Sequence, residues 1–204
     1  MRISIVIPAF NEARLLPATL REVQGACQAL WERRWETESI VCDNNSSDAT
    51  AEVARAAGAQ VVFEPINQIA RARNTGAAAA TGEWLIFIDA DSHPSRELFQ
   101  DAADQIESGK CLAGGSTVRL EEGYPWATRG VEFWNWLSRR LHWVAGSFVF
   151  CETNAFRTIG GFSHELFASE EVDLHRSLPL LPTRSCLLAQ TSRRHGTQPL
   201  QAKS

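Results

Sequence analysis

The chain has 204 residues, of which 44% are hydrophobic and 22% charged, and both values are those of a globular protein with a single buried core. Its formal net charge is −4 and its 20 basic residues are scattered, so we do not expect a nucleic acid as a partner. The five cysteines form no Cys-x-x-Cys pair, which disfavours a zinc site or a disulfide scaffold and fits a reducing cytoplasm.

The first half of the chain alternates apolar runs with helical patterns. Apolar runs without polar alternation predict strands covered on both faces at ISIVIP (3–8), ESIVCD (38–43), QVVFEP (60–65) and EWLIFID (83–89). The spacing of apolar residues and alanines predicts helices at 12–31, 48–57, 67–80 and 95–108. Strands that alternate with helices predict right-handed crossovers and a mostly parallel sheet, so we expect an α/β fold.

Cap and turn residues set the expected ends of these elements. Ser46 and Ser47 are candidate N-caps of the helix at 48–57, and Gly58 is its expected end. CLAGGSTVRL (111–120) predicts a further strand, loosened by its two central glycines. No linker or repeat separates a second domain, which predicts one domain over residues 1–204.

Polar side chains follow three of the predicted strands. The first strand runs into Asn11 and Glu12, the second into Asp43 and Asn44, and the fourth into an Asp-Ala-Asp stretch. In an open parallel sheet, ligands bind beyond the carboxyl ends of the strands, so these residues predict a binding site at one edge. A local helix cap is the alternative for the segment 44–47.

The stretch FIDADSHPS (87–95) ends an apolar run with two aspartates one residue apart. If the strand continued through them, Asp89 and Asp91 would project to the same side. Two carboxylates held so close repel each other unless a positive charge lies between them, and a divalent cation that carries phosphate oxygens is the natural candidate. A solvated turn is the alternative.

Two further segments supply candidate site residues. QIARARNTG carries Arg71 and Arg73, and guanidinium groups bind phosphate oxygens in a two-pronged way; the alternative is a solvated helix face. FASEEVDLHRSL places Glu170, Glu171 and Asp173 together, which is either a catalytic carboxylate or an acidic helix start. The sequence contains neither a dinucleotide-binding Gly-x-Gly-x-x-Gly after its first strand nor a P-loop.

Taken together, these motifs resemble family 2 glycosyltransferases of the GT-A fold, a Rossmann-like α/β fold. IVIPAFNEA resembles the family's Pro-x-Tyr-Asn-Glu signature, and VCDNNSSDAT its Val-Asp-Asp-Gly-Ser-x-Asp segment, with Asn44 in place of the second aspartate. ARARNTGAAAATGEWLIFIDADS resembles the stretch that leads into the family's metal-binding Asp-x-Asp. FASEEVDLHRSL resembles its Glu-Asp-x-Asp-Leu element, and TSRRH (191–195) the basic segment that closes over the diphosphate in some members.

The resemblance implies an inverting transfer of a sugar from a nucleoside-diphosphate sugar to an acceptor hydroxyl, with Mn²⁺ or Mg²⁺ as the cofactor. It implies a nucleotide-sugar-binding half at about 1–92 and an acceptor-binding half at about 93–204. Its implied site residues fall into three groups. The nucleotide and its phosphates would meet Pro8, Phe10, Glu12, Asp43, Arg73, Asp89, Arg193 and Arg194; the metal would meet Asp91, with Asp89 and His195 as further candidates; and the base would be Glu171 or Glu170.

Other functions remain open from the sequence. A sugar nucleotidyltransferase would also use acids at this edge, but PAFNEARLL lacks the glycine-rich, lysine-containing loop expected of one. A catalytically inactive nucleotide-sugar binder or a membrane-associated scaffold is the other alternative, because VEFWNWLSRRLHW (131–143) combines Trp with Arg as at a bilayer interface. No apolar run spans a bilayer, so we expect a cytoplasmic protein, with peripheral contact at the inner face of a membrane and a lipid-linked acceptor as open options.

Overall fold

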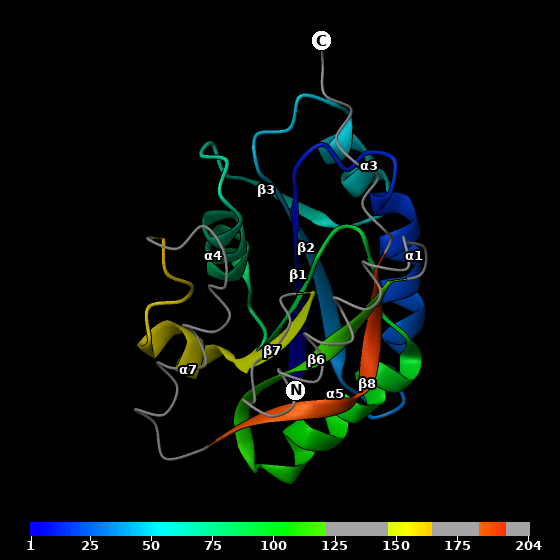
Figure 1. Cartoon of the computed structure of the whole chain (residues 1–204), viewed down its shortest axis with the longest axis vertical. Coiled ribbons are helices and arrows are strands. Elements are labelled where there is room, and N and C mark those ends of the chain that lie inside the picture. Colours follow the sequence, from blue (N-terminus) through cyan, green and yellow to red (C-terminus); the bar gives the residue numbers. More distant parts are fainter. Residues whose placement is uncertain (121–146, 165–183, 195–204) are drawn as a thin grey trace.

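The computed structural model describes residues 1–120, 147–164 and 184–194 (Figure 1). Their strands form one mixed sheet in the order β3-β2-β1-β4-β7-β6-β8-β5. The strands are β1 (Arg2–Ala9), β2 (Glu36–Asp43), β3 (Gln60–Phe63), β4 (Trp84–Ile88), β5 (Ser92–His93), β6 (Cys111–Leu120), β7 (Phe148–Glu152) and β8 (Arg184–Arg194). The four strands β1 to β4 are parallel, whereas β7 pairs antiparallel with both β4 and β6. The predicted α/β fold with a mostly parallel sheet is therefore confirmed.

Helices cover both faces of this sheet (Figure 1). They are α1 (Leu16–Ala26), α2 (Gln28–Trp31), α3 (Thr50–Ala56), α4 (Ile69–Ala79), α5 (Arg96–Ser108) and α7 (Thr153–Thr158). One apolar core packs alternate residues of β1, such as Ile5 and Ile7, against α1 and α5. A second core packs Val6 and Phe87 against α4 and α7. Because β1 and β4 are buried on both faces, their sequences show the continuous apolar runs that predicted them.

Gly76 lets helix α4 pack directly against β1. A Cβ atom at this position would lie 2.4 Å from Cγ1 of Val6 on β1. Glycine is therefore required here for close packing of α4 on β1. The same packing brings Arg73, one turn earlier in α4, to the carboxyl end of β4.

Several predicted element boundaries are wrong in ways that have local causes. The strand at 60–65 ends at Phe63, and β3 is an edge strand of the sheet rather than one covered on both faces, with Phe63 58% exposed. The helix predicted at 12–31 begins only at Leu16, and Cys27 separates α1 from α2.

The predicted end of α3 at Gly58 is confirmed. Gly58 follows the helix with a φ of 82°, a backbone conformation that glycine often adopts after a helix. Within the described part of the chain, no helix is both long and apolar enough to cross a membrane.

Candidate functional site

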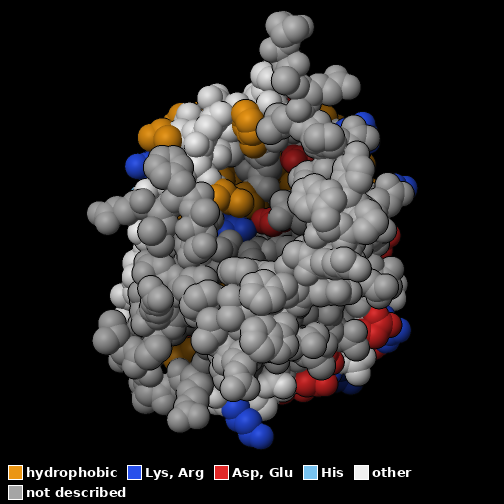
Figure 2. Space-filling model, viewed as in Figure 1, with side chains coloured by type: hydrophobic (Ala, Val, Ile, Leu, Met, Phe, Trp, Pro, Cys, Tyr) orange, Lys and Arg blue, Asp and Glu red, His pale blue; other side chains and the backbone are white. Residues whose placement is uncertain are grey.

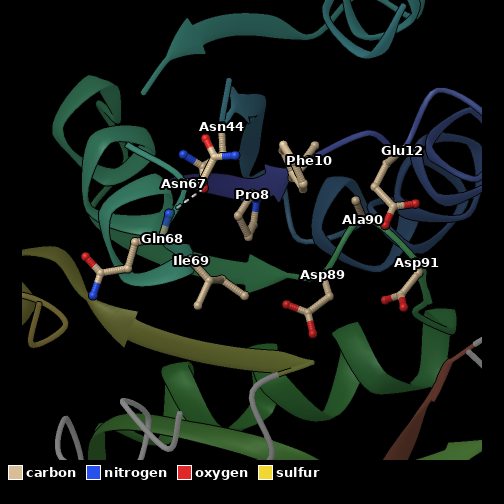
Figure 3. Close-up of a pocket in the computed structure, with 11 residues that line it drawn as sticks. Pro8, Phe10, Glu12, Asn44, Asn67, Gln68, Ile69, Asp89, Ala90 and Asp91 are labelled. Carbon is tan, nitrogen blue, oxygen red and sulfur yellow. Dashed lines mark hydrogen bonds between the residues drawn. The ribbon is translucent and has the colours of Figure 1, made fainter. Parts of the chain in front are cut away.

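A cavity of about 440 Å³ lies at the carboxyl ends of β1, β2 and β4 (Figure 3). Residues from each of these strand ends line it, together with the start of α4. They are Pro8, Ala9, Phe10, Glu12, Asn44, Asn67, Gln68, Ile69, Asp89, Ala90 and Asp91. The structure thus brings the three predicted polar strand exits together at one edge of the sheet. Figure 2 shows a hollow in this face of the molecule, with hydrophobic, acidic and basic side chains at its wall.

Asp89 and Asp91 both line this cavity, although not for the reason that strand alternation suggested. Strand β4 ends at Ile88, and the N–H of Ser92 donates to the carbonyl oxygen of Asp89 at 3.0 Å, which closes a turn. The hydroxyl of Thr19 on α1 donates to the carbonyl oxygen of Ala90 at 2.6 Å. The turn therefore sets the direction of both carboxylates, each on a residue that is only 8% exposed.

Arg73 forms a buried ion pair with Asp89. Its Nη2 atom lies 2.9 Å from Oδ1 of Asp89, and the Arg73 side chain is 1% exposed. The guanidinium carbon also lies 5.2 Å from the centre of the Phe162 ring, a cation–π arrangement. Arg73 does not line the cavity, so its predicted contact with phosphates stays a prediction, whereas its contact with Asp89 is shown.

The segment after β1 is held by residues between β2 and α3. The N–H of Asn11, whose φ is 55°, donates to the hydroxyl of Ser46 at 3.0 Å, and Oδ1 of Asn11 accepts from the N–H of Ser47 at 2.8 Å. Ser46 and Ser47 are therefore not N-caps of α3, contrary to the prediction, because they hold the site loop instead. The N–H of Glu12 likewise donates to the hydroxyl of Thr50 at 2.9 Å.

Asp48 supports the same loop. Burial alone would raise the pKa of its carboxyl, but hydrogen bonds from the Thr50 hydroxyl and from the N–H groups of Ala13 and Thr50 outweigh this and lower that pKa. The ionised carboxylate is the form that accepts these bonds. Its contact with the N–H of Ala13, at 3.1 Å, joins the start of α3 to the segment that carries Phe10 and Glu12.

The two polar residues after β2 have different surroundings. Oδ1 of Asp43 accepts from the N–H of Ser46 at 3.1 Å, and Asp43 does not line the described cavity, so its predicted nucleotide contact stays a prediction. Asn44 does line the cavity and binds the loop between β3 and α4. It is not a cap of α3, which was the alternative role considered for this segment.

Apolar side chains also line the cavity, of which Phe10 was predicted and Ile69 was not. Phe10, 47% exposed, and Ile69, 39% exposed, both line it. Asn67 and Gln68 complete the wall at the start of α4 (Figure 3). The sequence placed Ile69 only within the helix predicted at 67–80. The available signal was that Ile66 and Ile69 are large apolar residues at the start of an otherwise polar and alanine-rich segment.

The two aspartates fit a hard divalent cation that shares its coordination with a bound phosphate. Mg²⁺ in proteins is held by about one or two carboxylates together with substrate phosphates rather than by a full set of protein ligands. The described residues contain no group of three His, Cys, Asp or Glu side chains placed to hold a metal by themselves. Carboxylate oxygens from Asp89 and Asp91 are the ligand type that such an ion prefers.

The remaining predicted site residues lie late in the chain. In the pairing of β5 with β8, Arg194 is opposite Ser92 and Arg193 is opposite His93, so the backbone of both arginines runs beside the Asp89–Asp91 turn. The structure thus brings the basic segment to the predicted edge of the site. Five predictions lie outside the described residues. They concern Glu170, Glu171, Asp173, His195 and the aromatic stretch at 131–143.

Comparison with known sequences gives one family and several relatives. The sequence model of glycosyl transferase family 2 matches residues 4–160. An uncharacterized glycosyltransferase of Mycobacterium tuberculosis is 34% identical over 143 residues, which are 69% of this chain and 61% of that protein. An undecaprenyl-phosphate 4-deoxy-4-formamido-L-arabinose transferase of Pseudomonas fluorescens is 34% identical over 125 residues, which are 57% of this chain and 35% of that protein. The chain therefore spans less than two thirds of the length of these relatives.

Comparison with solved structures identifies proteins of similar fold. A mannosyltransferase of Pyrobaculum calidifontis, in complex with GDP-Man and Mn²⁺, superposes with a TM-score of 0.74. The match covers 98% of this chain and 58% of that chain, at 20% sequence identity. At this identity the likeness establishes a shared fold.

Proposed function

This chain belongs to glycosyl transferase family 2, with the GT-A fold that the sequence motifs predicted, and from this premise we propose that it moves a sugar from a nucleoside-diphosphate sugar to an acceptor hydroxyl with inversion of configuration. The observation that carries the proposal is the cavity that Asp89 and Asp91 line together with the apolar side chains of Phe10 and Ile69. Such a cavity offers both oxygen ligands and apolar surface. A nucleotide with a metal-bound diphosphate has matching chemistry.

At the donor end, Asp91 and Asp89 are the residues that would hold Mn²⁺ or Mg²⁺. When bound, such an ion neutralises the negative charge that develops on the departing nucleoside diphosphate. Arg193, Arg194 and His195 are proposed to add positive charge there, which the course of β8 beside β5 supports for the two arginines. Pro8, Phe10, Glu12 and Asp43 are proposed to hold the nucleoside.

At the acceptor end, a carboxylate removes the proton of the attacking hydroxyl. Glu171 is the proposed base, with Glu170 as the alternative, on the resemblance of FASEEVDLHRSL to the family's element. Attack from the side opposite the departing diphosphate inverts the anomeric centre. We propose a lipid-linked acceptor, which the similarity to the undecaprenyl-phosphate transferase of Pseudomonas supports. We also propose peripheral membrane contact through residues 131–143 on the cytoplasmic side.

Metal-dependent binding of nucleoside diphosphate tests this proposal. We expect Asp91→Ala to weaken binding of GDP or UDP in the presence of Mn²⁺ by about tenfold to a hundredfold, because a charged ligand to the cation is lost. Titration calorimetry with Mn²⁺ and with a chelator measures the effect. Asp104→Ala, which removes an exposed carboxylate on α5, is the control and should bind like the parent protein. Unchanged, metal-dependent binding by Asp91→Ala would show that the Asp-Ala-Asp stretch is only a structural turn.

A second titration concerns Asp43. We expect Asp43→Ala to weaken donor binding by about 1 to 3 kcal/mol, the usual effect of leaving a polar partner without its hydrogen bond. Thermal denaturation of the same variant separates this effect from loss of the turn that Asp43 closes with the N–H of Ser46. If donor affinity is unaltered while the melting temperature falls, Asp43 serves the turn alone.

A further inference from the structure

The side-chain amide of Asn44 holds the loop between β3 and α4 by three hydrogen bonds. Its Nδ2 atom donates to the carbonyl oxygens of Glu64, at 3.1 Å, and of Ile66, at 2.6 Å. Its Oδ1 atom accepts from the N–H of Gln68 at 3.0 Å. Asn44 is 5% exposed, so these bonds form largely out of water and the loop depends on them.

These bonds require an amide and exclude a carboxylate. An ionised aspartate has the same shape as asparagine but only accepts hydrogen bonds. At position 44 it would place an anionic oxygen against the two carbonyl oxygens of Glu64 and Ile66. The family motif has its second aspartate at this position. Asn44 therefore has a role in this chain that the aspartate could not fill.

The loop that Asn44 holds leads directly into one wall of the cavity. Asn67, Gln68 and Ile69 form that wall, and Figure 3 shows them across from Phe10. Helix α4 begins after Gln68, so the bond from the Gln68 N–H to Asn44 fixes where the helix starts. The wall can move only if these contacts are released.

A second tether holds the same loop from the far side. Oε2 of Glu64 accepts from the hydroxyl of Thr75 on α4 at 2.7 Å, and Oε1 accepts from the N–H of Ile66 at 3.0 Å. The hydrogen bond from Thr75, followed by that from Ile66, lowers the pKa of the Glu64 carboxyl, so the carboxylate is in its accepting form at neutral pH. Thr75 does not line the cavity.

We propose that Asn44 is a positioning residue that sets which nucleobase the cavity accepts, by fixing the wall at residues 67–69 rather than by binding the base itself. Both of its N–H groups are already directed to carbonyl oxygens of the loop. Phe10 lines the cavity together with Asn67, Gln68 and Ile69, and the loop that Asn44 holds sets where these last three residues lie, so it sets the outline of the space that is left for a base. This inference rests on the proposed binding of a nucleoside diphosphate.

The test compares ligands with and without a base. Binding of GDP, UDP and pyrophosphate, each with Mn²⁺, is measured by calorimetry for the parent protein and for Asn44→Asp. We expect the Kd of the preferred nucleotide to rise about tenfold, the ratio of the two nucleotide Kd values to approach one, and the pyrophosphate Kd to stay within about twofold. An unchanged nucleotide ratio, or an equal loss of pyrophosphate binding, would overturn the inference, since a general loss of structure affects all three ligands.

Thr75→Val is the second variant, because it loosens the same loop without touching the cavity. Thr75→Val should change the ratio of the GDP and UDP Kd values in the same direction as Asn44→Asp, but by a smaller factor. If Asn44→Asp does not fold, the result for Thr75→Val tests the inference in its place. Thr37→Val is its matched control: the Thr37 hydroxyl accepts from Trp31 Nε1 at 2.9 Å, in a part of the protein that does not line the cavity, and no change is expected. If the parent protein binds pyrophosphate but neither nucleotide, the proposed function itself fails, which is a different outcome from an unchanged ratio.

Discussion

Replacement of Arg73 by methionine is expected to lower the free energy of unfolding by about 3 to 5 kcal/mol. Arg73 is 1% exposed and its ion pair with Asp89 lies inside the protein, so the substitution leaves a carboxylate buried without its cationic partner. Loss of the cation–π contact with Phe162 adds to the effect. Urea denaturation followed by circular dichroism measures the change.

An exposed ion pair provides the matched control for this experiment. Nη2 of Arg96 lies 2.6 Å from Oε1 of Glu32, but the two side chains are 48% and 60% exposed. Arg96→Met should therefore cost no more than about 1 kcal/mol. Adding Asp89→Asn to Arg73→Met should restore part of the lost stability, because no buried charge then remains. Equal effects of Arg73→Met and Arg96→Met would show that burial does not strengthen the Arg73–Asp89 pair.

Replacement of Glu171 by glutamine is expected to lower turnover by about 10²- to 10⁴-fold and to leave donor binding unchanged. Glutamine keeps the size of the side chain but cannot accept the proton of the acceptor hydroxyl. Transfer is measured with a nucleotide-sugar donor and Mn²⁺, and binding of the nucleoside diphosphate is measured on the same preparation.

Glu170→Gln is the control for this assignment. If a helix begins near Ser169, Glu170 and Glu171 point about 100° apart around its axis, so only one of them can face an acceptor hydroxyl directly. Loss of turnover in Glu170→Gln with near-full activity in Glu171→Gln would move the base by one residue. Full activity in both variants would mean that the base lies elsewhere in the chain.

The predictable part of this protein is the part that depends on local patterns. The runs at 3–8 and 83–89 are continuous apolar segments because both faces of β1 and β4 are covered. Strands buried in this way can be predicted directly from the sequence. The edge on which the cavity lies was predictable for the same reason, because parallel strands bring their carboxyl ends together. Glu12, Asn44 and Asp91 could therefore be assigned to one site before any contact was known.

The rest depends on contacts between distant residues, which no local pattern records. The turn at Asp89 needs the Thr19 hydroxyl from α1, and the wall at Ile69 needs the amide of Asn44. Strand β7 was missed because its residues, FVFCE, follow an aromatic stretch without a clear boundary. Ser46 and Ser47 have the composition of helix caps, but long-range hydrogen bonds to Asn11 take precedence over capping.

The pairing of β5 with β8 has a consequence for the order in which the protein is completed during synthesis. Ser92 and Arg194 are partners in this pair although they are about a hundred residues apart in the chain, and contacts of such separation form late because closing a long loop costs entropy. Strands β1 to β4 and the ion pair between Arg73 and Asp89 all lie within the first 89 residues. Their contacts can therefore form in the nascent chain before β8 leaves the ribosome. The polypeptide can thus form β1 to β4 and the Arg73–Asp89 ion pair at one edge of the cavity before β8 is added beside the Asp89–Asp91 turn.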